Sequence, residues 1–455
     1  MSSAPRHEVH SSVPGLAAER PVIWPPRTHA NLANGLEIVL VESHTIPKFN
    51  GDLFFRSGNA AAGVPGLADL TAGVVRTGTA ARSSRQIEED LRRLGADLAS
   101  SAGTDTSVIS FGGLSEFSEE LLRLVAELAQ QASFPEGEFE RERRQMFEAL
   151  RIDRTTPGFL AGEGIRKILF AGHPYAQVAP TEAQVEGYRR EQLAEYYASH
   201  YRPGNALLVM AGDFEPRAML KQVEKIFSAW SGGAAESSPD PALGEIRGRR
   251  VRLVNLPGSV QTQILVGNRA ITRKHPDWKK LTLANSIYGG AFNSRLVMNI
   301  REQKGYTYSP RSGVHPLRQH GYFSIHAAVR NDVAAATLTE IFYELDRMRS
   351  VAVGDDELAD ARNYLSGVFS LGLATQDGLA SQIGTVALEN LPDDYLETYR
   401  EKIRDIQAAE VLDAAQKYFD SANAQIVVVG DRAQIESQVS LFGPVEVQDA
   451  QGNRI

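Results

Sequence analysis

Short apolar runs that follow turn signals predict β-strands in the first quarter of the chain. One run extends from Leu36 to Val41, directly after an Asn34-Gly35 turn, and another from Ser107 to Phe111. Runs of this length that are bounded by turn residues are typical of strands.

Other stretches show helical spacing instead. Between Ser118 and Ala132 the apolar positions recur every three or four residues, at Leu121, Leu122, Val125, Leu128 and Ala129. This spacing predicts an amphipathic helix that starts from a serine cap at Ser118. A second, highly charged helix is predicted over 139–154. Because strands and helices do not alternate strictly, the predicted fold class is α+β with a mostly antiparallel sheet.

The chain contains an internal repeat. Segment 201–213 combines a helix end, a turn and an apolar strand that closes on Gly-Asp, and segment 418–431 repeats this pattern 218 residues later. Segments 134–143 and 353–362 also match, 219 residues apart. Two matches at nearly the same offset indicate a duplicated domain of roughly 210 residues.

The repeat and the loop composition predict the domain boundaries. Residues 231–244 are rich in Gly, Ser and Pro and lack periodicity, so they are interpreted as a linker. The first domain then covers 26–230 and the second 245–445, after a flexible N-terminal arm over 1–25. The arm lacks the apolar core of a signal peptide. We therefore expect a cytoplasmic protein, or a periplasmic one if a leader has been removed.

Composition excludes several classes of function. A chain of 455 residues with 42% hydrophobic and 23% charged residues is an ordinary globular protein of two or more domains. Its net charge of -8 argues against nucleic acid or an anionic membrane as the main partner. The absence of cysteine excludes disulfides and thiolate chemistry. No apolar run is long enough to predict a membrane span.

One block in the second half carries candidate chemistry. It runs from Gly289-Gly290 through Ser294-Arg295-Leu296 to Tyr308, with Arg301 and Tyr308 seven residues apart. The block resembles the arginine/tyrosine signature of the M16 peptidases, the family of pitrilysin and the mitochondrial processing peptidase. The resemblance extends over nearly the whole chain and is to the M16B type, built from separate chains. It implies two duplicated M16-type α/β sandwich domains.

The resemblance also assigns roles within the block. It gives Tyr308 the stabilisation of the oxyanion that forms during amide hydrolysis, and Arg301 the anchoring of the substrate. Tyr306 is a rival for the tyrosine role, although the seven-residue spacing favours Tyr308. The alternative is purely structural: Arg301 would cap a helix end, and Tyr308 would be a strand aromatic within the sheet.

The zinc motif that accompanies this signature in M16 peptidases is degenerate. The family places His-x-x-Glu-His on a helix, so that two histidines share a zinc ion and the glutamate acts as base. Here Gly66-Leu67-Ala68 and Gly78-Thr79 match the family's flanking residues, but the histidine positions hold Asp69 and Gly73, and the base position holds Ala72. The distant third ligand position corresponds to Ala149. We therefore expect no metal in this chain.

The remaining histidines are weaker candidates. His315, His320 and His326 lie within twelve residues, on a predicted hairpin around Pro316 to Gly321. No carboxylate is interleaved with them, so they are interpreted as ordinary surface or core histidines. His173-Pro174-Tyr175 resembles a structural turn of the family.

The retained and lost motifs together suggest a subunit of a two-chain peptidase. The chain is expected to be inactive alone and to pair with a zinc-bearing M16 paralogue, supplying Arg301 and Tyr308 to the partner's zinc site. The substrates would be unfolded peptides. The main alternative is a catalytically silent scaffold or peptide-binding subunit. A peptidase acting alone would need a metal site that the sequence does not show.

Overall fold

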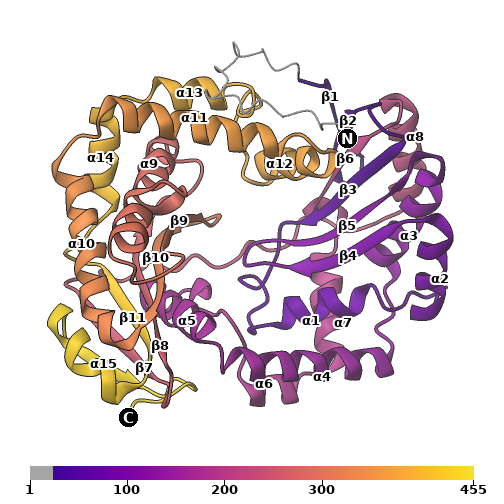
Figure 1. Ribbon diagram of the computed structural model, residues 1–455. Helices are drawn as coiled ribbons and strands as arrows, with labels where there is room; N and C mark the ends of the chain where they lie inside the picture. The colour runs from indigo at the N-terminus through magenta and orange to yellow at the C-terminus, as the bar shows by residue number, and fades with distance from the viewer. Residues whose placement is uncertain (1–23) are drawn as a thin grey trace, which may run out of the picture.

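The computed structural model describes residues 24–455, and these residues form two six-stranded sheets (Figure 1). The first sheet has the order β1-β2-β6-β3-β5-β4. Its strands are β1 Arg27–Asn31, β2 Glu37–Glu42, β3 Lys48–Phe55, β4 Asp97–Ala102, β5 Ser107–Leu114 and β6 Ala206–Gly212. Only β2 and β6 run parallel, and the other neighbours are antiparallel.

Five strands of the second sheet repeat this order, and the outer strand differs because β12 comes from the C-terminal end of the half, whereas β1 comes from the start of the first half. The second sheet reads β12-β7-β11-β8-β10-β9, and its parallel pairs are β12–β7 and β7–β11. The strands are β7 Arg250–Asn255, β8 Gln261–Ala270, β9 Arg311–Pro316, β10 Gly321–Arg330, β11 Gln425–Gly430 and β12 Val445–Gln448. The predicted α+β class with mostly antiparallel sheets is confirmed. The strands of the first sequence match, β6 and β11, occupy the same place in the two sheets.

Helices cover both sheets. In the first half they are α1 Leu67–Val75, α2 Ser84–Leu94, α3 Ser118–Gln131, α4 Glu136–Asp153, α5 Pro157–Leu169, α6 Glu182–Gly187, α7 Arg190–His200 and α8 Pro216–Phe227. In the second half they are α9 Trp278–Asn285, α10 Ala334–Ser350, α11 Asp355–Gly372, α12 Gln376–Leu388, α13 Tyr399–Asp405, α14 Ala408–Tyr418 and α15 Arg432–Val439.

The helices predicted over 118–132 and 139–154 are present as α3 and α4, but the serine cap is wrong. Ser118 is the first residue of α3, and the cap position is Phe117, which makes no capping hydrogen bond through its side chain. The chain enters α3 from a single 3₁₀ turn over Ser115–Phe117. The 3₁₀ turn therefore precedes α3 directly, in place of the cap by the Ser118 hydroxyl that the sequence predicted.

Each sheet packs one face against helices of its own half. In the first half, side chains such as Ile38, Leu208 and Met210 pack against α1, α3, α7 and α8. In the second half, Ile264, Val266 and Ile426 pack against α9, α10, α14 and α15. These side chains alternate along their strands with others that point to the opposite face.

The opposite faces are covered by an exchange of helices between the halves. Helix α12 of the second half packs on β6 and β3, and α5 of the first half packs on β11 and β8 (Figure 1). The two helices begin 219 residues apart, at Pro157 and Gln376, which is the offset of the sequence repeat. As a result β6 and β11 are buried on both faces along their whole length.

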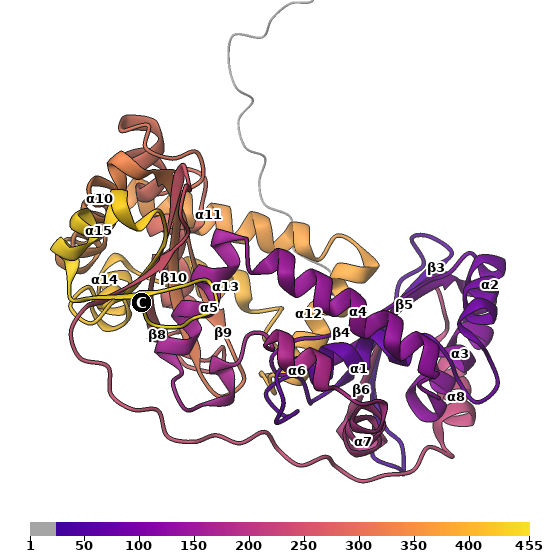
Figure 2. The same cartoon turned by 90° about the horizontal axis from the view of Figure 1, so that it is seen from below.

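The connection between the halves has no regular structure. From the end of α8 to β7 the chain forms neither helix nor strand, and Figure 2 shows it running along the edge of the molecule. Of the predicted N-terminal arm, residues 1–23 lie outside the described residues. No helix within residues 24–455 combines the length and apolar character needed to cross a membrane.

Candidate functional site

The Arg301–Tyr308 block folds as a π-helix followed by a loop. The π-helix spans Val297–Gln303, and Gly305 then takes a left-handed φ of 65°, which favours glycine. Upstream, a Cβ at Gly289 would lie 2.6 Å from the Ser312 hydroxyl, so the chain approaches β9 more closely than a larger residue allows. The glycines of the block therefore fix the path of its backbone.

Arg301 lies between two aromatic rings. The carbon of its guanidinium is 4.5 Å from the ring centroid of Tyr308 and 4.8 Å from that of Phe292. Tyr308 is 80% exposed and Phe292 71% exposed, whereas three quarters of the Arg301 side chain is covered. A guanidinium over aromatic faces gains a cation–π attraction. The stack holds Arg301 in place and leaves the Tyr308 hydroxyl in solvent.

Tyr308 is not the strand aromatic of the structural alternative. Tyr308 lies in a loop and not in a strand, and its hydroxyl has no hydrogen-bond partner among residues 24–455. Its rival Tyr306 instead packs against the core of the second half. The side chain of Thr307 donates to the Ala328 carbonyl at 2.6 Å and ties the loop to β10. The loop thus directs one tyrosine inward and the other outward.

Arg295 of the same block has a structural role. Its guanidinium forms two hydrogen bonds to Glu357 of α11, at 2.8 and 2.7 Å, and its side chain is only 10% exposed. This bidentate pair connects the block to α11.

The degenerate zinc motif lies on α1 in the first half. Asp69 accepts a hydrogen bond from the Asn59 amide at 3.0 Å. Burial raises the pKa of Asp69 to about 6, and the Asn59 hydrogen bond opposes this shift. Tyr188 and Tyr196 lie near enough to feel the charge of Asp69. The first histidine position is therefore occupied by a half-buried carboxylate without a basic partner.

The other motif positions offer no ligand atom. Ala72 is buried in the core, and a Cβ at Gly73 would lie 3.3 Å from the Glu142 carboxylate of α4. Ala149, predicted at the third ligand position, is exposed and lies seven residues further along α4. A catalytic zinc ion takes about three protein ligands, and these positions supply none of the family's imidazoles. The zinc ion implied by the resemblance therefore does not fit this chain.

The three histidines of the β9–β10 hairpin do not converge. His315 and His326 both approach the Ser324 hydroxyl, at 2.8 and 3.0 Å. Burial lowers the pKa of both, to about 4 for His326, which favours neutral rings. His320 lies at the tip of the hairpin, apart from this pair. The interpretation of His315 and His326 as structural residues agrees with these contacts.

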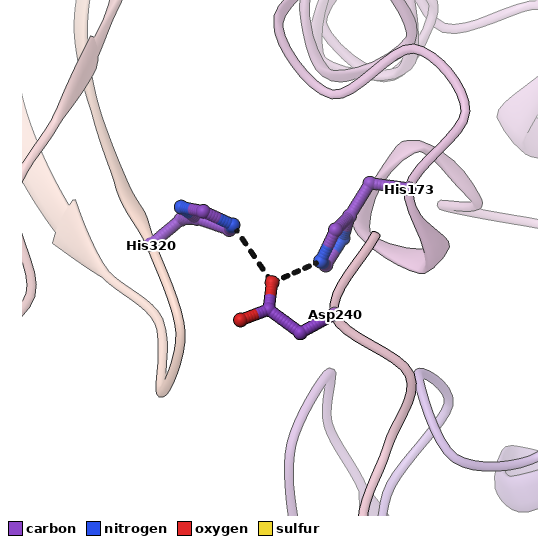
Figure 3. Close-up of side chains that lie close together, drawn as sticks. All are labelled: His173, Asp240 and His320. Carbon is purple, nitrogen blue, oxygen red and sulfur yellow. Dashed lines mark hydrogen bonds and ion pairs between the residues drawn. The ribbon is translucent and has the colours of Figure 1, made fainter. Parts of the chain in front are cut away.

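His320 instead lies close to His173 and Asp240 (Figure 3). The three residues are far apart in the sequence. One oxygen of Asp240 lies 3.3 Å from His173 Nε2 and 3.1 Å from His320 Nε2. The group has the composition of a metal site. However, His173 Nδ1 accepts a hydrogen bond from the backbone N–H of Tyr175 at 3.0 Å. A neutral ring that accepts at Nδ1 carries its proton on Nε2, so His173 donates to Asp240 and has no lone pair for a metal.

Sequence reasoning missed Phe292, Glu142 and Asp240. Phe292 lies inside the recognised block, but nine residues before Arg301, and no spacing in the sequence indicated the contact of the two side chains. Glu142 belongs to a charged helix in which nothing distinguishes one glutamate from another. Asp240 lies in the predicted linker, 80 residues from His320, and no local pattern connects the two.

Comparison with known proteins relates the chain to the M16 family. Residues 188–365 match the family model described as the peptidase M16 inactive domain. An uncharacterized zinc protease from Rickettsia bellii is 24% identical over 88% of this chain and 96% of its own length. The non-peptidase homolog YmxG from Helicobacter pylori is 22% identical over 87% of this chain and 92% of its own length.

A solved structure shows the same fold. The peptidase M16 inactive domain from Pseudomonas fluorescens superimposes with a TM-score of 0.83 at 28% identity, covering 89% of this chain and 98% of its own. The match includes both sheets, since it extends over most of the chain. Together with the motif block and the duplicated fold, these similarities relate the chain to the peptidase M16 inactive domain and to the two-domain fold of its solved relative.

Proposed function

We propose that the chain is the non-zinc subunit of a two-chain M16 metallopeptidase and supplies Arg301 and Tyr308 to the zinc site of a partner. The supporting observation is the contrast between the two motifs. The Tyr308 hydroxyl is exposed and unpaired beside a stacked Arg301, while α1 carries Asp69, Ala72 and Gly73 in place of the zinc ligands and base. If Arg301 and Tyr308 had no function, the large aromatic ring of Tyr308 would not need to be exposed to solvent.

The chemistry of the pair suits peptide hydrolysis. Negative charge develops on the carbonyl oxygen when an amide is attacked, and a phenol hydroxyl can donate a hydrogen bond to that oxygen. The Arg301 guanidinium, fixed between two rings, can bind the neighbouring substrate backbone. Zinc belongs to the partner subunit in this proposal, and this chain supplies only the two side chains.

Unfolded peptides are the proposed substrates. Edge strand β9 begins at Arg311, three residues after Tyr308. A peptide that adds to the free edge of this strand would form main-chain hydrogen bonds with it and pass the Arg301–Tyr308 pair. Because main-chain hydrogen bonds do not depend on side chains, extended peptides of many sequences could bind in this way.

Substitution of the pair in the assembled complex tests the proposal. The chain would be mixed with a zinc-bearing M16 paralogue from the same source, and kcat/KM would be measured with a fluorogenic peptide. We expect Tyr308→Phe and Arg301→Ala each to lower kcat/KM by about 10²-fold, as the removal of one oxyanion donor does. Tyr343→Phe is the control, because Tyr343 is exposed on α10 in the same half.

The same experiment distinguishes the alternative. If both variants sustain full turnover, the pair has no part in catalysis, and the chain is a scaffold or peptide-holding subunit. The name of the Helicobacter pylori relative, a non-peptidase homolog, favours this second function. Peptide affinity measured on the same variants would then show whether Arg301 and Tyr308 contribute to binding.

A further inference from the structure

A second candidate site lies in the second half, apart from the Arg301–Tyr308 loop. A cavity of about 380 Å³ opens between the start of α9 and the segment that follows α12. Six basic side chains line it: Arg273, Lys274, His275, Lys279, Lys280 and Lys402. The opposite wall is mainly apolar, with Leu391, Pro392 and Tyr395, and two carboxylates, Asp405 and Glu410, also line the cavity.

The positive charge of this cavity is only partly balanced, because five Lys and Arg side chains face the two carboxylates of Asp405 and Glu410. Lys280 is paired, with Glu410 at 3.0 Å and Asp277 at 3.7 Å. Within residues 24–455, Arg273, Lys274, Lys279 and Lys402 have no carboxylate at ion-pair distance. The chain as a whole carries a net charge of -8, so this concentration of cations is local. A recess lined with charges of one sign attracts ions of the other sign.

Lys279 is half-buried in the wall of the cavity. Its ammonium lies 4.1 Å from the ring centroid of Tyr395. Burial lowers the pKa of Lys279 to about 8, and the nearby charge of Lys402 contributes in the same direction. A half-buried ammonium beside a like charge is destabilised relative to water, and a bound anion would relieve this cost.

We propose that the cavity binds a small molecule bearing phosphate groups, with Lys279 and Lys402 as its main contacts. Three of the four unpaired cations are lysines, whose compact ammonium groups suit a multiply charged oxyanion, whereas a single carboxylate would leave charge uncompensated. The volume lies within the range of small-molecule sites. The site is independent of the proposed role of Arg301 and Tyr308.

The position of the cavity gives binding a structural consequence. Leu391 and Tyr395 belong to the apolar cluster that holds α12 against the first sheet. A ligand in the cavity would therefore brace the segment that follows the exchanged helix. Because a ligand that binds only the folded state raises its stability, saturation should raise the Tm of the chain.

Calorimetric titration of the full chain with inorganic pyrophosphate, at fixed ionic strength, tests the proposal. We expect one saturable site, and a Kd at least about tenfold weaker in Lys279→Gln/Lys402→Gln, since a hydrogen bond to a charged group contributes that much or more. Lys402→Gln alone provides a second variant, because Lys402 is exposed and its replacement leaves the core intact. The control Lys48→Gln/Lys221→Gln removes the same charge from exposed positions elsewhere and should keep Kd within about twofold.

Three results would overturn the proposal. One is the absence of saturable binding at millimolar pyrophosphate. Another is an equal loss of affinity in the control variant, which would reveal a general charge effect. The third is equal or tighter binding of citrate, which would assign the cavity to carboxylates instead of phosphates.

Discussion

At the scale of single residues, Asp69 is a carboxylate in an unfavourable environment. Asp69 occupies a half-buried position on α1, where its one hydrogen-bond partner within residues 24–455 is the neutral Asn59 amide. Its carboxyl is therefore easier to keep protonated in the folded chain than in the unfolded one. Its pKa is about 6 in the folded state against an unfolded value of 3.8.

The difference between the two pKa values of Asp69 determines how stability changes with pH. Between the two pKa values the folded state binds more protons, so stability is full below the unfolded pKa and falls as pH rises through about 6. We predict that Asp69→Asn, which keeps an acceptor for Asn59, stabilises the chain on the order of 2 kcal/mol at pH 7.5 and very little at pH 4. Thermal unfolding of both proteins across this range measures the difference. The exposed Asp97→Asn is the control, and a gap in Tm that does not grow with pH would refute the prediction.

The contacts of the Arg301–Tyr308 block could be predicted only in part from the sequence. The spacing of Arg301 and Tyr308 indicated a pair, and the structure stacks their side chains. The spacing could not predict Phe292 as the second ring, because Phe292 lies in the turn before the π-helix of Arg301, and no periodicity of the sequence relates the two residues. Their roles in catalysis remain a proposal.

At the scale of elements, the exchange of α5 and α12 joins the two halves. Ile165 of α5 packs against the bare backbone of Gly267 in β8, where an added Cβ would lie 2.7 Å from its side chain. The sequence predicted apolar strands that would become β6 and β11. It could not predict which helices cover them, because an apolar stripe on a helix does not specify its partner.

We predict that Ile165→Ala loosens the sheet of the other half. Removal of a fully buried aliphatic side chain costs about 2–5 kcal/mol, and the cavity would open beside β8 and β11. Hydrogen exchange should show lost protection in β8 and β11, whereas Val368→Ala on the exposed face of α11 should change little. If protection falls only within the first sheet, the exchange of helices does not carry the stability assigned to it.

At the scale of the whole molecule, the β9–β10 hairpin of the second half forms hydrogen bonds to the first half. Arg318 at its tip donates to the carbonyl oxygens of Arg56 at 2.7 Å and Asp105 at 2.8 Å. Gln319 donates through its backbone N–H to the Tyr175 hydroxyl at 3.2 Å and through its side chain to the carbonyl of Ser238 at 3.1 Å. These partners are separated by up to 262 residues, so no local pattern could predict the contact.

We expect Arg318→Ala to weaken the contact between the tip of the β9–β10 hairpin and the first half. Loss of two charge-assisted hydrogen bonds should cost on the order of 3 kcal/mol, lower Tm and speed proteolytic cleavage between residues 231 and 244. Arg330→Ala, at the other end of β10, is the matched control because its side chain is exposed and pairs with the neighbouring Asp332. Unchanged cleavage in Arg318→Ala would mean that the hairpin tip does not restrain the connecting segment.

The central claim is the proposed pairing of this chain, which carries Arg301 and Tyr308, with a partner that carries zinc. Peptidase activity of the purified chain, alone and mixed with a zinc-bearing M16 paralogue from the same source, tests it most directly. The proposal predicts no hydrolysis by the chain alone and hydrolysis above the partner's own rate on mixing. Zinc-dependent hydrolysis by the chain alone, or a mixture no faster than the partner, would contradict it.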